Sequence, residues 1–371
     1  MKNIKEIELA DILKDLPEIA LLDCEKQFQY REFDVFFCAL GFEERCLSIP
    51  EKLAEIKDFK CTESICFEYS TNVEDNEVNK PNLIRAFQKY TTSWNFLQCD
   101  GENFTKNLRE FLCKVTKLNK NPEIIFDISV FSSKLLISTI KVLLEFDICL
   151  QVVYSEAAIY HPTCNEFEKE PENWTTEEGF GIARGVSNVV PSSEYPGITR
   201  ENPDLIVAFA TFKPERTKTI ITYIDETLLI QPSKRIIWIV GDPHMDEETK
   251  KKRKNMLREI NKILIEAPSY EVCTLNYKKT LEILDQIYKK NHLDCYISIL
   301  ALGSKMQSLG IALFCYIRPD IPIYHAIPKE YNSKQYSEGC RKTWQIDFGN
   351  LANIRLILDK VGKTVKINNN L

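Results

Sequence analysis

Short apolar runs alternate with amphipathic stretches along the first part of the chain. Apolar runs lie at 33–40, 63–69, 94–99, 123–130 and 149–154, and segments with helical spacing of apolar residues lie at 43–56, 78–90, 104–118 and 133–146. Strands that are apolar on both faces are typical of a parallel sheet covered by helices. The pattern therefore predicts a Rossmann-like α/β unit.

The second part of the chain repeats this order of elements. Predicted strands lie at 204–211, 234–241, 270–276, 295–302 and 321–327, with predicted helices at 214–228, 246–264, 278–290 and 304–317. Arg45 and Arg216 follow the first strand of each part, Lys134 and Lys305 follow the fourth, and each pair is about 171 residues apart. We therefore predict two tandem Rossmann-like units with mainly parallel sheets, produced by an internal duplication.

The predicted organisation has three parts. A first unit with an N-terminal helical segment spans 1–160, and a second unit with a C-terminal appendage spans 203–371. The segment 161–202 between them is rich in Pro, Gly, Ser and acidic residues, and is either a plain linker or an insert that acts as a lid or an interface arm.

Composition narrows the class of protein. The chain has 371 residues, of which 44% are hydrophobic and 27% charged, as in ordinary globular proteins. No apolar segment reaches the roughly 18 to 20 uncharged residues that cross a bilayer, and the first residues do not resemble a signal peptide. We expect a cytoplasmic protein that does not act at a membrane.

Cysteine usage, net charge and the absence of known motifs disfavour a metal site, general nucleic-acid binding and a bound cofactor. The 13 cysteines are scattered without a CxxC pair and the chain has only 4 histidines, so we expect no metal site. The net charge of −6 disfavours general nucleic-acid binding, and the basic run at 250–254 alternates with acidic and apolar residues, as on the exposed face of a helix. The chain has no GxGxxG, GxxxxGK[ST] or GxSxG motif, and we expect no bound cofactor.

The repeated polar clusters mark a candidate ligand site. They follow the first and fourth strands of each unit, at the carboxyl ends where open α/β sheets bind ligands and where helix N-termini favour anions. The candidate binding residues are Arg45, Ser129, Ser132, Ser133, Lys134, Arg216, Gly303, Ser304 and Lys305. We expect an anion or nucleotide pocket in each unit, although the serines are equally explained as helix N-caps and the lysines as solvated residues of the first turn.

The segments DISVFSSK (127–134) and ALGSK (301–305) resemble the motif after strand four of CARF domains, and two such units in one chain resemble the SAVED sensors of antiviral defence. The segments ALGFEER and ATFKPER match more loosely. The glycine-rich turn of CARF domains is replaced here by FSSK and LGSK. The resemblance implies binding of a cyclic oligonucleotide by the loops after strands one and four, with a separate protein as effector, because no effector domain is attached.

Three functions remain open at this stage. The first is a sensor that binds a nucleotide or other phosphorylated small molecule. The second is an enzyme acting on a nucleotide or nucleic acid, such as a cyclic-oligonucleotide nuclease or a nucleosidase-like hydrolase, with Glu43, Glu44 or Asp127 as general acid or base. The third is an interaction protein whose segment 161–202 and tyrosine-rich C-terminal segment recruit a partner.

Overall fold

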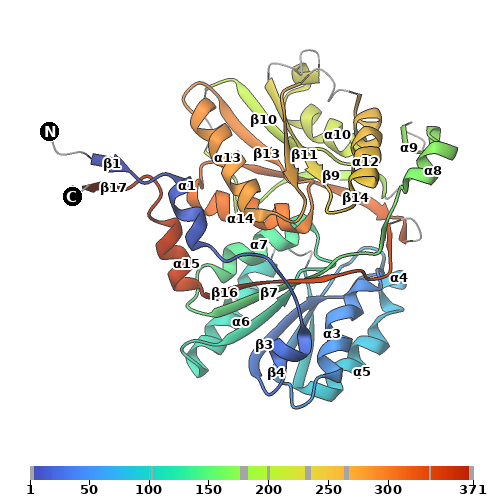
Figure 1. The fold of residues 1–371 in the computed structure, drawn as a ribbon, viewed down its shortest axis with the longest axis vertical. Coiled ribbons are helices and arrows are strands. Elements are labelled where there is room, and N and C mark those ends of the chain that lie inside the picture. The colour runs from blue at the N-terminus through green and yellow to red at the C-terminus, as the bar shows by residue number, and fades with distance from the viewer. Residues whose placement is uncertain are drawn as a thin grey trace.

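The computed structural model describes residues 4–99, 101, 103–175, 183–198, 201–229, 235–262, 267–333 and 336–366. Two α/β units lie one above the other, each built on its own sheet (Figure 1). We call the unit that begins the chain the first unit and the other the second unit.

The first unit has five parallel strands in the order β5-β4-β3-β6-β7. The strands are β3 (Glu32–Ala39), β4 (Lys60–Glu68), β5 (Thr91–Gln98), β6 (Glu123–Asp127) and β7 (Cys149–Ser155). The helices are α2 (Cys24–Phe28), α3 (Arg45–Glu55), α4 (Val73–Glu77), α5 (Lys80–Tyr90), α6 (Phe104–Leu118) and α7 (Ser133–Leu143). Each predicted strand and helix of this part of the chain is present.

The second unit repeats this topology, with its five parallel strands in the order β12-β11-β10-β13-β14. The strands are β10 (Asp204–Phe209), β11 (Ile236–Asp242), β12 (Ser269–Cys273), β13 (Tyr296–Leu300) and β14 (Ile323–Tyr331). The helical elements are α10 (Pro214–Asp225), η2 (Glu226–Leu229), α12 (Glu247–Ile260), α13 (Tyr277–Asn291) and α14 (Lys305–Ile317). The predicted tandem Rossmann-like architecture is confirmed, and equivalent loops carry the residues that the repeat pairs.

The two units exchange edge strands. The last parallel strand of the first sheet, β7, pairs antiparallel with β16 (Thr343–Asn350), which comes from the end of the chain. The last parallel strand of the second sheet, β14, pairs antiparallel with β9 (Ala183–Pro191), which lies before the second unit. The division at 160 and 202 does not anticipate this exchange, because it treats 161–202 as an insert and assigns residues 343–350 to the second unit.

The remaining elements lie at the two ends of the chain and in the segments that follow the two sheets. They are β1 (Ile4–Glu6), α1 (Leu9–Ile12), η1 (Leu13–Asp15), β2 (Ala20–Leu21), β8 (Ile159–Tyr160), α8 (Cys164–Lys169), α9 (Glu172–Thr175), β15 (Ser337–Glu338), α15 (Leu351–Leu358) and β17 (Thr364–Lys366). β1 pairs with β17, so the described ends lie side by side (Figure 1). β15 pairs with β8, which joins the segments that follow the two sheets.

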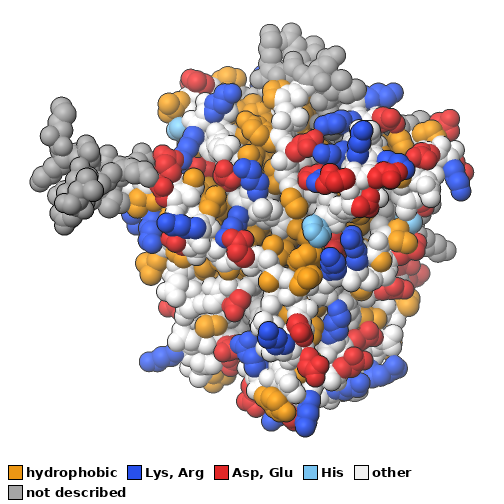
Figure 2. Space-filling model, viewed as in Figure 1, with side chains coloured by type: hydrophobic (Ala, Val, Ile, Leu, Met, Phe, Trp, Pro, Cys, Tyr) orange, Lys and Arg blue, Asp and Glu red, His pale blue; other side chains and the backbone are white. Residues whose placement is uncertain are grey.

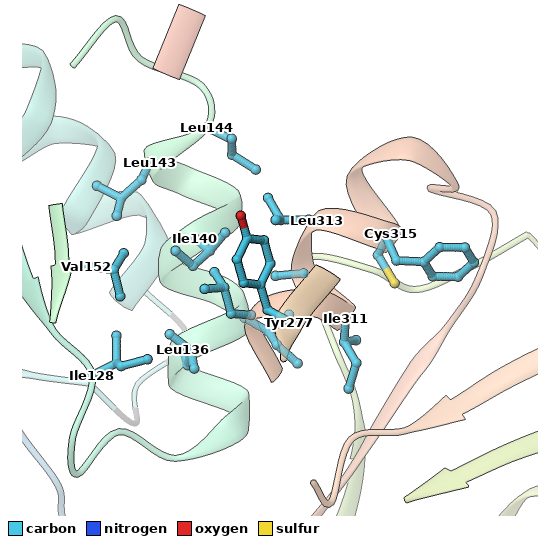
Figure 3. Close-up of a cluster of buried hydrophobic side chains, with 14 of the residues drawn as sticks. Ile128, Leu136, Ile140, Leu143, Leu144, Val152, Tyr277, Ile311, Leu313 and Cys315 are labelled. Carbon is cyan, nitrogen blue, oxygen red and sulfur yellow. The ribbon is translucent and has the colours of Figure 1, made fainter. Parts of the chain in front are cut away.

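Helices α7 and α14, which are equivalent in the repeat, form the seam between the units (Figure 1). Leu136 and Ile140 of α7 are buried in the same apolar cluster as Tyr277 and Leu313 of the second unit (Figure 3). At the start of the seam the Ser308 hydroxyl donates to the Ser133 hydroxyl at 2.9 Å. The seam therefore brings the N-terminal ends of α7 and α14 close together.

Helix α12 carries the basic run on a surface of mixed charge (Figure 2). Lys250 pairs with Asp242 at 2.8 Å and Lys254 with Glu271 at 2.9 Å. Arg253 turns inward and donates to the carbonyl oxygens of Tyr160 and Pro162. Much of the run is thus neutralised or buried.

None of the helices that the structure describes has the length and apolar character of a membrane span.

Candidate anion-binding site

The loops that carry the repeated cations face one another across the seam. Lys305, at the start of α14, lies within electrostatic reach of Glu43 and Arg45 of the first unit and of Arg216 of the second. Lys134, at the start of α7, lies within reach of His325 on β14, which Arg216 also approaches. The candidate cations of both units therefore lie near one another, at a place that we call the inter-unit site.

Arg45 and Glu43 form a buried ion pair on the first-unit side of this site. Arg45 donates through Nε and Nη2 to one carboxylate oxygen of Glu43, and through Nη1 to the Ser155 carbonyl at 3.2 Å. The Ser337 hydroxyl donates to the same Glu43 oxygen. Both side chains are almost fully buried. The pair is therefore largely satisfied within the protein, and it neutralises its own charge.

Lys134 and Lys305 have no such compensation. Both are half-buried in the first turns of α7 and α14, and among the described residues neither forms an ion pair. Burial lowers the pKa of Lys305 to about 8; Glu43 opposes this shift, and repulsion from Arg45 and Arg216 adds to it. Each amine also lies at a helix N-terminus, where the aligned peptide dipoles add positive potential.

Arg216 and His325 present unpaired nitrogen atoms. Arg216 donates through Nη2 to the Ala326 carbonyl at 2.7 Å, but its buried Nε has no hydrogen-bond partner among the described residues. His325 is 4% exposed, and its Nε2 is also buried without a partner there. Burial lowers the pKa of His325 to about 3, with further lowering from Lys134 and Arg216, so the imidazole is uncharged at pH 7.

Three aromatic rings lie beside the cations. Tyr336 is 5.6 Å, centroid to centroid, from both Phe42 and Tyr331, and Phe42 is 6.1 Å from Tyr331. Asn72 holds this corner by exchanging two hydrogen bonds with the backbone of Tyr331, at 2.9 and 3.0 Å. Tyr336 lies within electrostatic reach of Glu43, and its burial raises the phenol pKa. All three residues are half-buried.

Several candidate residues have structural roles. Ser129 donates to the Asp127 carboxylate and accepts from the Ser155 backbone at 2.8 Å, which braces β6 against β7. Burial raises the pKa of Asp127 to about 7, although the hydrogen bonds from Ser129 oppose this shift. Ser132 accepts from the Leu135 backbone and so caps α7.

Candidate residues of the second unit also have structural roles. Ser304 caps α14 by accepting from the Gln307 backbone, and its hydroxyl donates to the Thr274 carbonyl at 2.6 Å. A Cβ on Gly303 would lie 2.7 Å from the Phe209 ring, so this glycine permits close packing. Glu44 is exposed at the N-cap of α3. Of the predicted serines, Ser133 lies at the seam, paired with Ser308.

Sequence reasoning missed Tyr336 and Ser337. They lie after the second sheet, in the tyrosine-rich C-terminal segment that the sequence predicts to be an appendage or a partner-recruiting arm. Ser337 reaches the site because β15 pairs with β8. Their only signal in the sequence was the clustering of tyrosines after the last parallel strand.

No protein-family model matches this sequence, and no curated protein matches it. Solved structures align over most of the chain, but with low similarity. The cytoplasmic domain of a prokaryotic cation chloride cotransporter aligns at 8% identity and a TM-score of 0.24, over 82% of this chain and 99% of that one. A universal stress protein from Archaeoglobus fulgidus aligns at 13% identity and a TM-score of 0.21, over 81% and 97%. The UDP-GlcNAc 2-epimerase of Methanocaldococcus jannaschii, solved with UDP-GlcNAc and UDP, aligns at 12% identity and a TM-score of 0.23, over 76% and 92%. These scores are too low to support an argument about function.

Proposed function

We propose that the protein is a cytoplasmic sensor or regulatory protein that binds a nucleotide or other phosphorylated small molecule between its two units. The observation that carries the proposal is the excess of positive charge in the inter-unit site. Lys134, Arg216 and Lys305 gather there, and the nearby acid Glu43 is already paired with Arg45.

Like charges gathered in a partly desolvated site repel one another, and this repulsion costs free energy that an anionic ligand would relieve. Phosphate suits the site because it accepts several charge-assisted hydrogen bonds from ammonium and guanidinium groups and from helix N-termini. The half-buried rings of Phe42, Tyr331 and Tyr336 offer a contact surface for a nucleobase.

The resemblance to CARF and SAVED sensors fits this placement. A cyclic oligonucleotide would be a suitable ligand, the biological setting would be antiphage defence in a prokaryote, and a separate effector protein would respond to the bound state.

Binding is favoured over turnover by the state of the candidate acids. Glu43 is engaged by Arg45 and Ser337, Asp127 by Ser129, and Glu44 lies exposed at a helix start. None of these carboxylates is both free and directed at the cations, which a general acid or base for a bound phosphorylated substrate would require.

The test is a ligand screen with matched variants. The protein is purified gently, denatured, and its released small molecules are identified by mass spectrometry. The melting temperature of the protein is then measured with mononucleotides, dinucleotides and cyclic oligonucleotides. A ligand at 100 times its Kd stabilises the native state by about 2.7 kcal/mol, which is readily measured.

The variants compare equal changes in charge. In Lys134→Ala/Lys305→Ala the ligand-induced shift should disappear, whereas Lys117→Ala/Lys251→Ala, which removes two exposed lysines, should retain it. No shift with any ligand in the wild type would contradict the function. An equal shift in both double variants would place the ligand elsewhere.

A further inference from the structure

His325 differs from the other polar residues of the inter-unit site because it is buried, uncharged and unpaired. Strand β14 presents alternate side chains to opposite faces of its sheet. Tyr324 and Ala326 pack on the side of α10, with Ile220 and Ile221, whereas Ile323 packs in the cluster that contains the seam. His325 shares the face of Ile323 and so faces the seam.

Both charged neighbours of His325 are donors. Lys134 approaches from the first unit and Arg216 from α10. The backbone of β14 pairs with β13 and β9. The Nε2 atom of the His325 side chain has no hydrogen-bond partner among the described residues. Leaving a buried nitrogen unpaired destabilises the folded protein. An apolar side chain of similar size would avoid this cost.

The unpaired nitrogen is unsuited to binding a phosphate by charge. Since the pKa of His325 is lowered to about 3, the ring adds no charge to the site at pH 7. A neutral imidazole nitrogen instead donates to or accepts from an uncharged polar group, such as a hydroxyl. Arg216, beside it, has an unpaired Nε that can donate to a phosphate oxygen. Arg216 and His325 together therefore suit a ligand that carries a hydroxyl group close to a phosphate.

We propose that His325 is a specificity-determining residue that hydrogen bonds a sugar hydroxyl next to a phosphate held by Arg216 and Lys134. This inference rests on the proposed function, and it deepens it: the site selects a sugar phosphate or nucleotide over an inorganic phosphate chain. A site built to hydrogen bond a hydroxyl discriminates strongly against ligands that lack it, because its own polar group then stays unpaired.

The test compares ADP with inorganic pyrophosphate, which carries the diphosphate without the sugar. Affinities are measured by isothermal titration calorimetry at pH 7 for the wild type, for His325→Leu, which removes the hydrogen bond, and for His325→Gln, which keeps an uncharged polar group. Thermal unfolding without ligand checks that each variant is folded. His325→Leu should unfold no earlier than the wild type, because it removes an unpaired buried nitrogen.

We expect the wild type to prefer ADP. His325→Leu should weaken ADP binding by about tenfold and leave pyrophosphate binding unchanged, and His325→Gln should recover most of the loss. If the wild type binds both ligands but His325→Leu changes neither affinity, or changes both equally, the role of His325 is wrong and the proposed function stands. Tighter binding of pyrophosphate than of ADP by the wild type would also overturn the selectivity alone. If the wild type binds neither ADP nor pyrophosphate, the inferred selection of a sugar phosphate is wrong, and the proposed function is decided separately by the screen of mononucleotides, dinucleotides and cyclic oligonucleotides.

Discussion

The lowered pKa of Lys305 predicts how the affinity for an anionic ligand depends on pH. With a pKa of about 8, the amine of the free protein is roughly nine-tenths protonated at pH 7 and roughly one-tenth protonated at pH 9. An anionic ligand favours the ammonium form and raises this pKa on binding. The affinity should therefore fall as pH rises through 8, by about tenfold between pH 7 and pH 9 if only the ammonium form binds.

Lys305→Arg isolates this effect, because a guanidinium remains charged throughout the range. Asp127, whose pKa is about 7, also ionises nearby, but it is present in both proteins and does not affect the comparison. The phosphate groups of the ligand titrate near pH 6 and are fully ionised over most of the range. Lys251→Arg, at an exposed position, serves as the matched control.

The assay is calorimetric titration at pH 7, 8 and 9 in buffers of different ionisation enthalpy, which also counts the protons taken up. The wild type and Lys251→Arg should take up close to one proton per ligand at pH 9 and bind about tenfold more weakly than at pH 7. Lys305→Arg should show a flat profile. Equal pH slopes in Lys305→Arg and the wild type, or affinity that rises with pH, would refute the reasoning.

Other perturbations should affect stability without touching the ligand. Burial raises the pKa of Asp127 to about 7, so the wild type should lose stability as pH rises from about 4 to 7; Asp127→Asn should not, and its melting temperature relative to the wild type should rise between pH 5 and pH 8. A Cβ on Gly310 would lie 2.6 Å from the Tyr277 carbonyl, where α13 and α14 approach closely, so Gly310→Ala should cost about 1–3 kcal/mol in chemical denaturation with ligand affinity unchanged. Arg253→Ala removes the hydrogen bonds to the Tyr160 and Pro162 carbonyls and should increase hydrogen exchange in α8, with no change in the exchange of α7.

The sequence was sufficient to predict the two units, because buried parallel strands are continuously apolar and the helices between them keep a helical period. The end of β6 was less predictable. The apolar run continues to Val130, but the strand ends at Asp127, where the carboxylate accepts from the Ser129 backbone and forms a local turn. The exchange of β9 and β16 between the sheets could not be foreseen either, since a single edge strand carries no mark of the sheet that it joins.

The candidate site was likewise only partly predictable from the sequence. The repeat pointed to Lys134 and Lys305 because both follow the fourth strand of their units, but the convergence of the two sets depends on the packing of α7 on α14. Local sequence also could not separate Ser132, which caps a helix, from Ser133, which lies at the seam one residue later.

The central claim is that both units contribute to one ligand site, and binding stoichiometry tests it most directly. The nucleotide that gives the largest thermal shift is titrated by calorimetry into the wild type, Lys134→Ala and Lys305→Ala. We expect one ligand per chain in the wild type, and weaker binding of that same ligand in each single variant, because one phosphorylated group is held by residues from both units. Two ligands per chain in the wild type, with one site lost in each variant and the other unchanged, would contradict the account and restore a separate pocket in each unit.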